Sequence, residues 1–183
     1  YGISILSVVP GREEASDKAE MVTQLLFGDH YKIIDERVNW VKIRIAFDKY
    51  ECWIDRKQVF EVSKEIFEEV ETSREWTSCT DLVNIIQNAN NNEMQPIAMG
   101  SVLPFFKNKI ITIGSEHFAF EGNTAHSKET LSRSKILENA LLYINAPYLW
   151  GGKSPFGIDC SGLTQMVYKI AGKKLPRDAY QQA

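Results

Sequence analysis

One cysteine, Cys160, stands where the sequence predicts the first turn of a helix. Asp159 before it is a good N-cap residue. Apolar residues then recur at helical spacing: Leu163, Met166, Val167, Ile170 and Ala171. Backbone N–H groups left unpaired in a first turn, together with the helix dipole, stabilise a thiolate. The pattern favours a nucleophilic cysteine; the alternative is a small buried residue, as most free cysteines are.

The segment before this cysteine is dense in turn and aromatic residues. Residues 146–162 read A-P-Y-L-W-G-G-K-S-P-F-G-I-D-C-S-G. Pro147 and the pair Gly151-Gly152 predict one tight bend, and Pro155 with Gly157 predicts a second. The predicted helix therefore follows a tightly folded loop.

The pattern Y-L-W-G-G-x-S-x-x-G-x-D-C-S-G at residues 148–162 resembles the nucleophile motif of the NlpC family of papain-like cysteine peptidases, and L-P-R-D at 175–178 continues it. Enzymes of this family cut bacterial cell-wall peptides. The resemblance implies that Cys160 is the nucleophile and that Tyr148 is a hydroxyl donor near the oxyanion.

The resemblance also implies substrate contacts. Asp159 would pair with a free N-terminal amine, and Ser161 would contact the substrate beside it. We place Trp150 on the substrate side as well. Each residue has a structural alternative: Asp159 as a helix cap, Ser161 as a first-turn residue, and Tyr148 and Trp150 as core residues.

Peptide hydrolysis by a thiolate also needs an imidazole to protonate the leaving amine, and a third polar group to orient it. In this family the histidine comes from a strand well after the nucleophile helix. All three histidines of this sequence precede Cys160 and lie outside the motif: His30, His117 and His126. We interpret His117 and His126 as structural or surface residues, the first in an alternating run and the second in a loop.

Residues 1–62 read as short strands separated by turns, which is typical of a small barrel. The order of a polar loop, W-V-x-I and D-x-Y-x-x-W-I resembles a bacterial SH3-like domain of the kind that precedes NlpC peptidase domains. Cys52 occupies the position before the second tryptophan, where a glycine is usual. In such relatives a glutamate of the long loop and a tyrosine near the end of the barrel meet the substrate amine. By position these are Glu13 or Glu14, and Tyr50.

The remaining segments predict a connector and a second β domain. Residues 63–75 form an acidic amphipathic segment, which we interpret as a solvated connector helix. Residues 76–125 hold five strand candidates, including V-L-P-F-F at 102–106, and we predict a second SH3-like domain by position. Residues 127–145 predict a helix with an apolar stripe that Pro147 ends: Ile136, Leu137, Ala140, Leu141 and Ile144. Asp178, three residues before Gln181, predicts the capping box of a further helix.

Composition excludes several function classes. The net charge of −3 gives no electrostatic case for binding nucleic acid, and no apolar run approaches the length of a membrane span. The three cysteines lack metal-ligand spacing, so we expect no metal and no cofactor. Cys52 and Cys79 could pair in an oxidising compartment, but buried free thiols fit their apolar surroundings better.

These observations predict a multidomain chain. Two small SH3-like β barrels (1–62 and 76–125), joined by the connector (63–75), precede a papain-like α+β domain (127–183) that we expect to be truncated and to leave Leu163, Met166 and Val167 partly uncovered. We expect a murein-peptide hydrolase that cleaves γ-D-Glu–diamino acid bonds in peptides with a free N-terminal L-Ala. Without a downstream histidine, the chain itself should be inactive.

Two other classes remain open. One is a non-catalytic module that binds peptidoglycan peptides, and the other is a thiol-dependent acyltransferase on the same fold. We expect an exported protein whose leader has been removed, with peptide recycling in the cytoplasm as the alternative.

Overall fold

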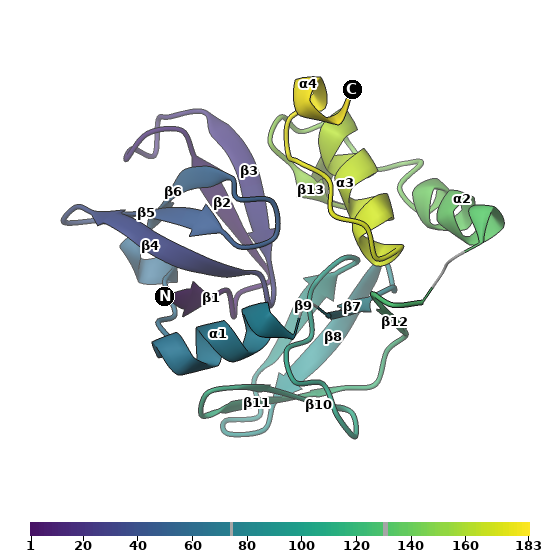
Figure 1. The fold of residues 1–183 in the computed structure, drawn as a ribbon, viewed down its shortest axis with the longest axis horizontal. Helices are drawn as coiled ribbons and strands as arrows, with labels where there is room; N and C mark the ends of the chain where they lie inside the picture. Colours follow the sequence, from purple (N-terminus) through teal and green to yellow (C-terminus); the bar gives the residue numbers. More distant parts are fainter. Residues whose placement is uncertain (74, 130–131) are drawn as a thin grey trace.

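A computed structural model describes residues 1–73, 75–129 and 132–183. The N-terminal unit is one antiparallel sheet in the order β1-β4-β5-β6-β2-β3 (Figure 1). Its strands are β1 (Gly2–Ile3), β2 (Val8–Arg12), β3 (Met21–Leu26), β4 (His30–Glu36), β5 (Trp40–Ile45) and β6 (Glu51–Asp55), followed by the 3-10 helix η1 (Arg56–Gln58).

The predicted strands of this unit follow from alternation. In β5, the side chains of Val41, Ile43 and Ile45 are buried. Lys42 and Arg44, on the other face, both pair with Glu51 on the neighbouring β6. Successive side chains of a strand point to opposite faces, so this sequence can bury only one of them.

The closed barrel that the sequence predicts is not confirmed for the N-terminal sheet. Within the described residues, the hydrogen-bonded order is linear and ends at β1 on one side and β3 on the other. Tyr31, Val41 and Ile54 belong to the core of this unit. The unit is therefore a curled open sheet around its own core.

The helix α1 (Lys64–Thr72) confirms the predicted connector, with Ser63 as its N-cap and Arg74 outside the described residues. Glu65, Glu68 and Glu69 are exposed, but Phe67 is buried and packs on Tyr1 at 4.7 Å between ring centroids. Glu71 accepts hydrogen bonds from His30 and Lys49, both at 3.0 Å. The connector is therefore docked on the N-terminal sheet and is not merely solvated.

The second β unit contains two small sheets. One has the order β10-β11-β8-β9, and the other pairs β12 with β7. The strands are β7 (Thr77–Cys79), β8 (Val83–Asn88), β9 (Met94–Ala98), β10 (Ile110–Ile113), β11 (Glu116–Phe120) and β12 (Thr124–His126). A second barrel is not confirmed by this arrangement.

The predicted strand at residues 102–106 is wrong. Val102 forms only an isolated bridge to Ser78, and the chain then turns, with Phe105 at φ 50°. Pro104 in the middle lacks the N–H that a central strand needs. An apolar run of this length does not by itself separate a strand from a buried turn.

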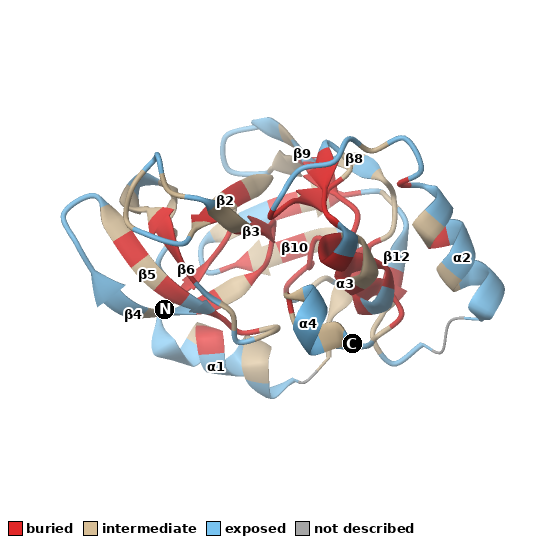
Figure 2. Cartoon of the chain, turned by 90° about the horizontal axis from the view of Figure 1, so that it is seen from above, coloured by how far each residue is buried: buried red, intermediate tan, exposed pale blue. Residues whose placement is uncertain are grey.

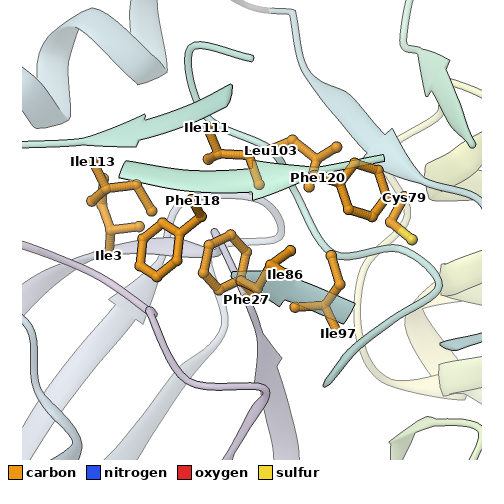
Figure 3. Packing of buried hydrophobic residues seen from close by; sticks show 10 residues of the cluster. All are labelled: Ile3, Phe27, Cys79, Ile86, Ile97, Leu103, Ile111, Ile113, Phe118 and Phe120. Atoms are coloured by element: carbon orange, nitrogen blue, oxygen red, sulfur yellow. The ribbon is translucent and has the colours of Figure 1, made fainter. Parts of the chain in front are cut away.

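The core of the second β unit includes side chains of the first. Ile3 and Phe27 of the N-terminal unit lie among the apolar side chains of the second unit (Figure 3). The rings of Phe27 and Phe118 meet edge to face, 5.2 Å apart. The second sheet therefore buries its apolar face against residues of the first unit.

The turn before β4 fixes this contact. Gly28 has φ +79°, and a Cβ atom there would lie 2.0 Å from the carbonyl oxygen of Val102. The N–H of Val102 donates to the carbonyl of Phe27 at 2.9 Å. Only glycine allows the backbones of the two units to approach this closely.

The last segment holds α2 (Arg133–Leu141), β13 (Lys153–Ser154), β14 (Gly157–Ile158), α3 (Cys160–Ile170) and α4 (Ala179–Gln182). The expectation that Leu163, Met166 and Val167 would be partly uncovered is wrong for the last two, which are buried, while Leu163 is half-buried. The helix α3 packs against Leu26 and Met99 from the two β units. None of the described helices is long and apolar enough to cross a membrane.

The predicted apolar stripe of residues 127–145 is also wrong. The helix α2 is shorter, residues 130 and 131 lie outside the described part, and Leu137 and Leu141 are exposed. Asn139 is the buried residue of α2, which projects from the side of the molecule (Figures 1 and 2). Spacing alone predicted an apolar face, but the described elements do not cover it.

Candidate active site

Cys160 is the first residue of α3, which confirms the predicted helix start. All three cysteines are free thiols. Cys160 is exposed, whereas Cys52 and Cys79 are buried. Asp159 precedes Cys160 in extended conformation, as an N-cap residue does. The thiol therefore lies at the positive end of an eleven-residue helix.

The Asp159 carboxylate is the centre of a buried polar network. Its Oδ1 accepts from the N–H of Gly162 at 2.7 Å, and its Oδ2 accepts from the N–H of Gly151 at 2.9 Å. Arg177 donates to both oxygens, at 3.0 and 2.7 Å. Burial alone would raise the pKa of Asp159, but these hydrogen bonds and the guanidinium charge hold it below its ordinary value.

Ser161 belongs to the same network. Its Oγ donates to Asp159 at 3.2 Å and accepts from Arg177 at 2.7 Å. Both structural alternatives of the sequence analysis therefore exist: Asp159 caps the helix, and Ser161 is tied into the first turn. Their roles as substrate contacts stay predictions. Arg177 was missed as a site residue, although it is the arginine of L-P-R-D.

The loop before Cys160 is pressed against the N-terminal unit. Gly151 has φ +77°, and a Cβ atom there would lie 2.4 Å from the carbonyl oxygen of Met21. The N–H of Lys153 donates to Oε1 of Gln24 at 2.7 Å. The glycine pair of the motif therefore allows the loop to contact β3, and this contact brings the N-terminal unit beside the thiol.

A pocket of about 510 Å³ opens at Cys160. The N-terminal unit contributes Glu13, Glu20 and Tyr50 to its wall, and Trp150 and the network of Asp159 also line it. Both predicted glutamates are exposed; Glu13 lines the pocket and Glu14 does not, and the substrate role of either stays a prediction.

Glu20 was missed by the sequence analysis. The N–H of Glu13 donates to the carbonyl of Glu20 at 2.9 Å, so the two ends of the polar loop lie side by side. Sequence position alone does not show this pairing, because it depends on how the hairpin between β2 and β3 closes.

Three aromatic residues have different positions. Tyr50 lines the pocket beside Asp178, and its pKa is raised first by burial and then by the Asp178 carboxylate. Trp150 is 60% exposed at the pocket wall. Tyr148 is 69% exposed, pairs with Ile158 and is not among the lining residues. The core alternative is therefore wrong for Tyr148 and Trp150.

None of the three histidines is among the described residues that line this pocket. His30 bonds to Glu71, and His117 is exposed on β11. His126 ends β12, 3.6 Å from Glu75, and does not lie in a loop as predicted. The pocket brings together a thiol, carboxylates and aromatic side chains, an arrangement suited to nucleophilic attack on a ligand that carries a cation.

The predicted helix after Asp178 is present as α4, but Asp178 makes no side-chain hydrogen bond to it. The predicted helix is therefore confirmed, but the predicted capping box is wrong. Together with burial, the carboxylate of Asp178 instead raises the pKa of Tyr50.

Comparisons with known proteins match two parts of the chain. Residues 11–59 match the bacterial dipeptidyl-peptidase SH3 domain, and residues 145–183 match the NlpC/P60 family. The chain is 30% identical to dipeptidyl-peptidase 6 of Lysinibacillus sphaericus, over 88% of this chain and 66% of that protein. It is 26% identical to the γ-D-glutamyl-L-lysine dipeptidyl-peptidase of Bacillus subtilis, over 88% of this chain and 57% of that protein.

Solved structures show the same fold. An NlpC/P60 family protein from Bacillus cereus superposes with a TM-score of 0.84, at 17% identity, over 99% of this chain and 75% of that one. An NlpC/P60 endopeptidase from Photobacterium damselae gives 0.75, at 19% identity, over 100% and 45%. The chain spans between 54% and 66% of the first curated relatives it matches. With an SH3 domain of the bacterial dipeptidyl-peptidase type before the matched segment, the chain belongs to the NlpC/P60 family.

Proposed function

We propose that this chain is part of a cysteine peptidase that hydrolyses cell-wall (murein) peptides. The observation that carries the proposal is the shared pocket: the Cys160 thiol at a helix N-terminus faces the same space as Glu13 and Glu20 of the SH3-like unit. A thiolate there would attack a peptide carbonyl, while the carboxylates would hold a cationic group of the same substrate.

We further propose cleavage of the γ-D-Glu–diamino acid bond in peptides with a free N-terminal L-Ala. The γ-D-glutamyl-L-lysine peptidase name of two relatives supports the bond. Glu13 and Glu20 support the free amine, since an ammonium group is the natural partner of two carboxylates in a pocket. Asp159 already pairs with Arg177, so we assign the amine first to the two glutamates.

Residues 1–183 on their own should turn over peptide feebly. No histidine lines the described pocket, and loss of a general acid and base typically lowers the rate by about 10²- to 10⁴-fold. The same observation favours a second candidate, a module that binds peptidoglycan peptides without cleaving them. For either function, we propose that the protein is exported.

The test compares L-Ala-γ-D-Glu-L-Lys with its N-acetyl form, by calorimetric binding and by chromatographic detection of hydrolysis. We expect the chain to bind the free-amine peptide, and Glu13→Gln and Glu20→Gln each to weaken that binding by about tenfold. Glu14→Gln is the matched control and should bind normally. Equal binding of the free and acetylated peptides would contradict the proposed substrate polarity.

Turnover separates the two candidates. The Bacillus subtilis relative serves as the positive control, and Cys160→Ala as the blank. Slow hydrolysis that disappears in Cys160→Ala supports the peptidase. Tight binding with no hydrolysis beyond the blank supports the binding module.

A further inference from the structure

A second pocket, of about 240 Å³, lies away from Cys160 and shares no lining residue with the first. Its wall is built by several parts of the chain: Phe47 from the N-terminal unit, Val70 from α1, the segment that leads into β7, the turn at residues 102–106, and Lys174 after α3. None of these residues has a part in the proposed reaction.

The aromatic wall is held in place. The rings of Phe47 and Trp76 meet edge to face, 5.8 Å apart. The indole N–H of Trp76 donates to the carbonyl of Lys169 at 3.3 Å. Phe105 and Phe106 add two more rings, and Phe105 is 40% exposed. An apolar body, flat enough to pack between rings, fits this wall.

The carboxylates of this pocket are already paired. Asp29 binds Lys169 at 2.7 Å, and Glu75 pairs with Lys128. Hydrogen bonds, first from His30 and then from Lys49, lower the pKa of Glu71 to about 2 against its partial burial, so it stays ionised and paired. A cationic ligand would find no carboxylate without a partner here.

The ammonium group of Lys174 also lines this pocket. Its ammonium lies 5.6 Å from the ring centroid of Phe47 and 5.5 Å from that of Trp76. It makes no ion pair or side-chain hydrogen bond with any residue that the structure describes. Lys174 is exposed at the pocket rim, and desolvation lowers its pKa although the Glu71 carboxylate acts in the opposite direction. A further anion bound to the ammonium would raise this pKa.

We propose that this pocket binds a small aromatic monocarboxylate, with its ring between Trp76 and Phe105 and its carboxylate on Lys174. A single negative charge matches the one lysine among the described lining residues, whose ammonium forms no ion pair with another described residue. A phosphate dianion is disfavoured, because Glu71 and Glu75 lie in the same wall and would repel the second charge.

The test is an NMR titration of the chain with 3-phenylpropionate and with its neutral amide. The sequence has four tryptophans, and Trp76→Phe identifies the indole N–H signal that lies in this pocket. We expect saturable shifts of that signal with the carboxylate, at the modest affinity typical of a ligand this small. The neutral amide should bind about tenfold more weakly, because a charge-assisted hydrogen bond is lost.

Lys174→Gln removes the charge, and Lys173→Gln is the matched control, since Lys173 is exposed like Lys174 but does not line the pocket. Lys174→Gln should weaken carboxylate binding about tenfold relative to Lys173→Gln and leave amide binding unchanged, which also shows that the pocket is intact. The proposal is overturned if the two variants bind the carboxylate alike, if carboxylate and amide bind alike, or if Trp76 does not respond.

Discussion

At the scale of single residues, the three cysteines differ in exposure. Cys160 is exposed at a helix start, whereas burial raises the pKa of Cys52 and of Cys79 to about 12. Thiolates and not thiols react with alkylating agents, so the native chain presents one reactive sulfur.

We therefore expect one iodoacetamide adduct on the native chain and three after unfolding in guanidinium. Intact-mass spectrometry counts the adducts, and peptide mapping places the native one on Cys160. Cys160→Ser should carry none while folded. Two or more native adducts at similar rates would mean that Cys52 or Cys79 is accessible.

Arg177 shows what a motif reveals and what it leaves out. Its position in L-P-R-D follows from the sequence, and so does an N-cap at Asp159. Their bidentate ion pair joins residues 18 positions apart, and depends on how the chain returns after α3. No local pattern carries that information.

At the scale of elements, α3 connects the units of the molecule. Its Lys169 forms an ion pair with Asp29 in the turn between β3 and β4, and both side chains are at most 2% exposed. The amide of Gln165 on the same helix donates to Asp48 of the N-terminal unit at 2.9 Å. The helix that presents the thiol is therefore fixed to the SH3-like unit by buried polar contacts.

Lys169→Met should lower the free energy of unfolding by about 3–5 kcal/mol, because it leaves the Asp29 carboxylate buried without its partner. Asp29→Asn in the same chain should recover part of this loss, since a neutral amide needs no counter-charge. Urea unfolding measures both variants, with the exposed Lys173→Met as control. Simply additive losses would show that the pair contributes no coupling.

Some elements could be predicted from local sequence patterns, and others could not. The strands at residues 21–26 and 40–45 and the helix start at Cys160 follow from alternation, capping and spacing, which are local. The turn at 102–106 and the exposed stripe of α2 could not be read this way. Whether each segment is buried depends on which other part of the chain packs against it, and the hydrophobic pattern of one segment does not carry this information.

At the scale of the whole molecule, buried carboxylates tie stability to pH. Burial alone would raise the pKa values of Asp29 and Asp159, but Lys169 and Arg177 hold them below the ordinary value. The unfolded chain therefore binds protons at a higher pH than the folded chain. This stabilisation is complete above the ordinary aspartate pKa of about 4, and is lost as the pH falls through the folded-state values.

We expect the urea midpoint to fall steeply below about pH 4 because of these two groups. Asp29→Asn should be less stable at pH 7 and should show a shallower decline in acid. Asp17→Asn is the control, since Asp17 is exposed and forms no ion pair with the described residues. If the urea midpoint of Asp29→Asn fell with pH as steeply as that of the unchanged chain, Asp29 would not contribute to the loss of stability in acid.

Ile3 and Phe27 complete the core of the second unit from within the first, and Gly28 allows no side chain where the two backbones meet. This sets where the gene can be cut. A recombination junction after residue 62 would separate a sheet from the side chains that fill its interior, although it falls near the end of a recognisable domain. We therefore expect a chimera joined at that position to fold only when both β units come from the same parent.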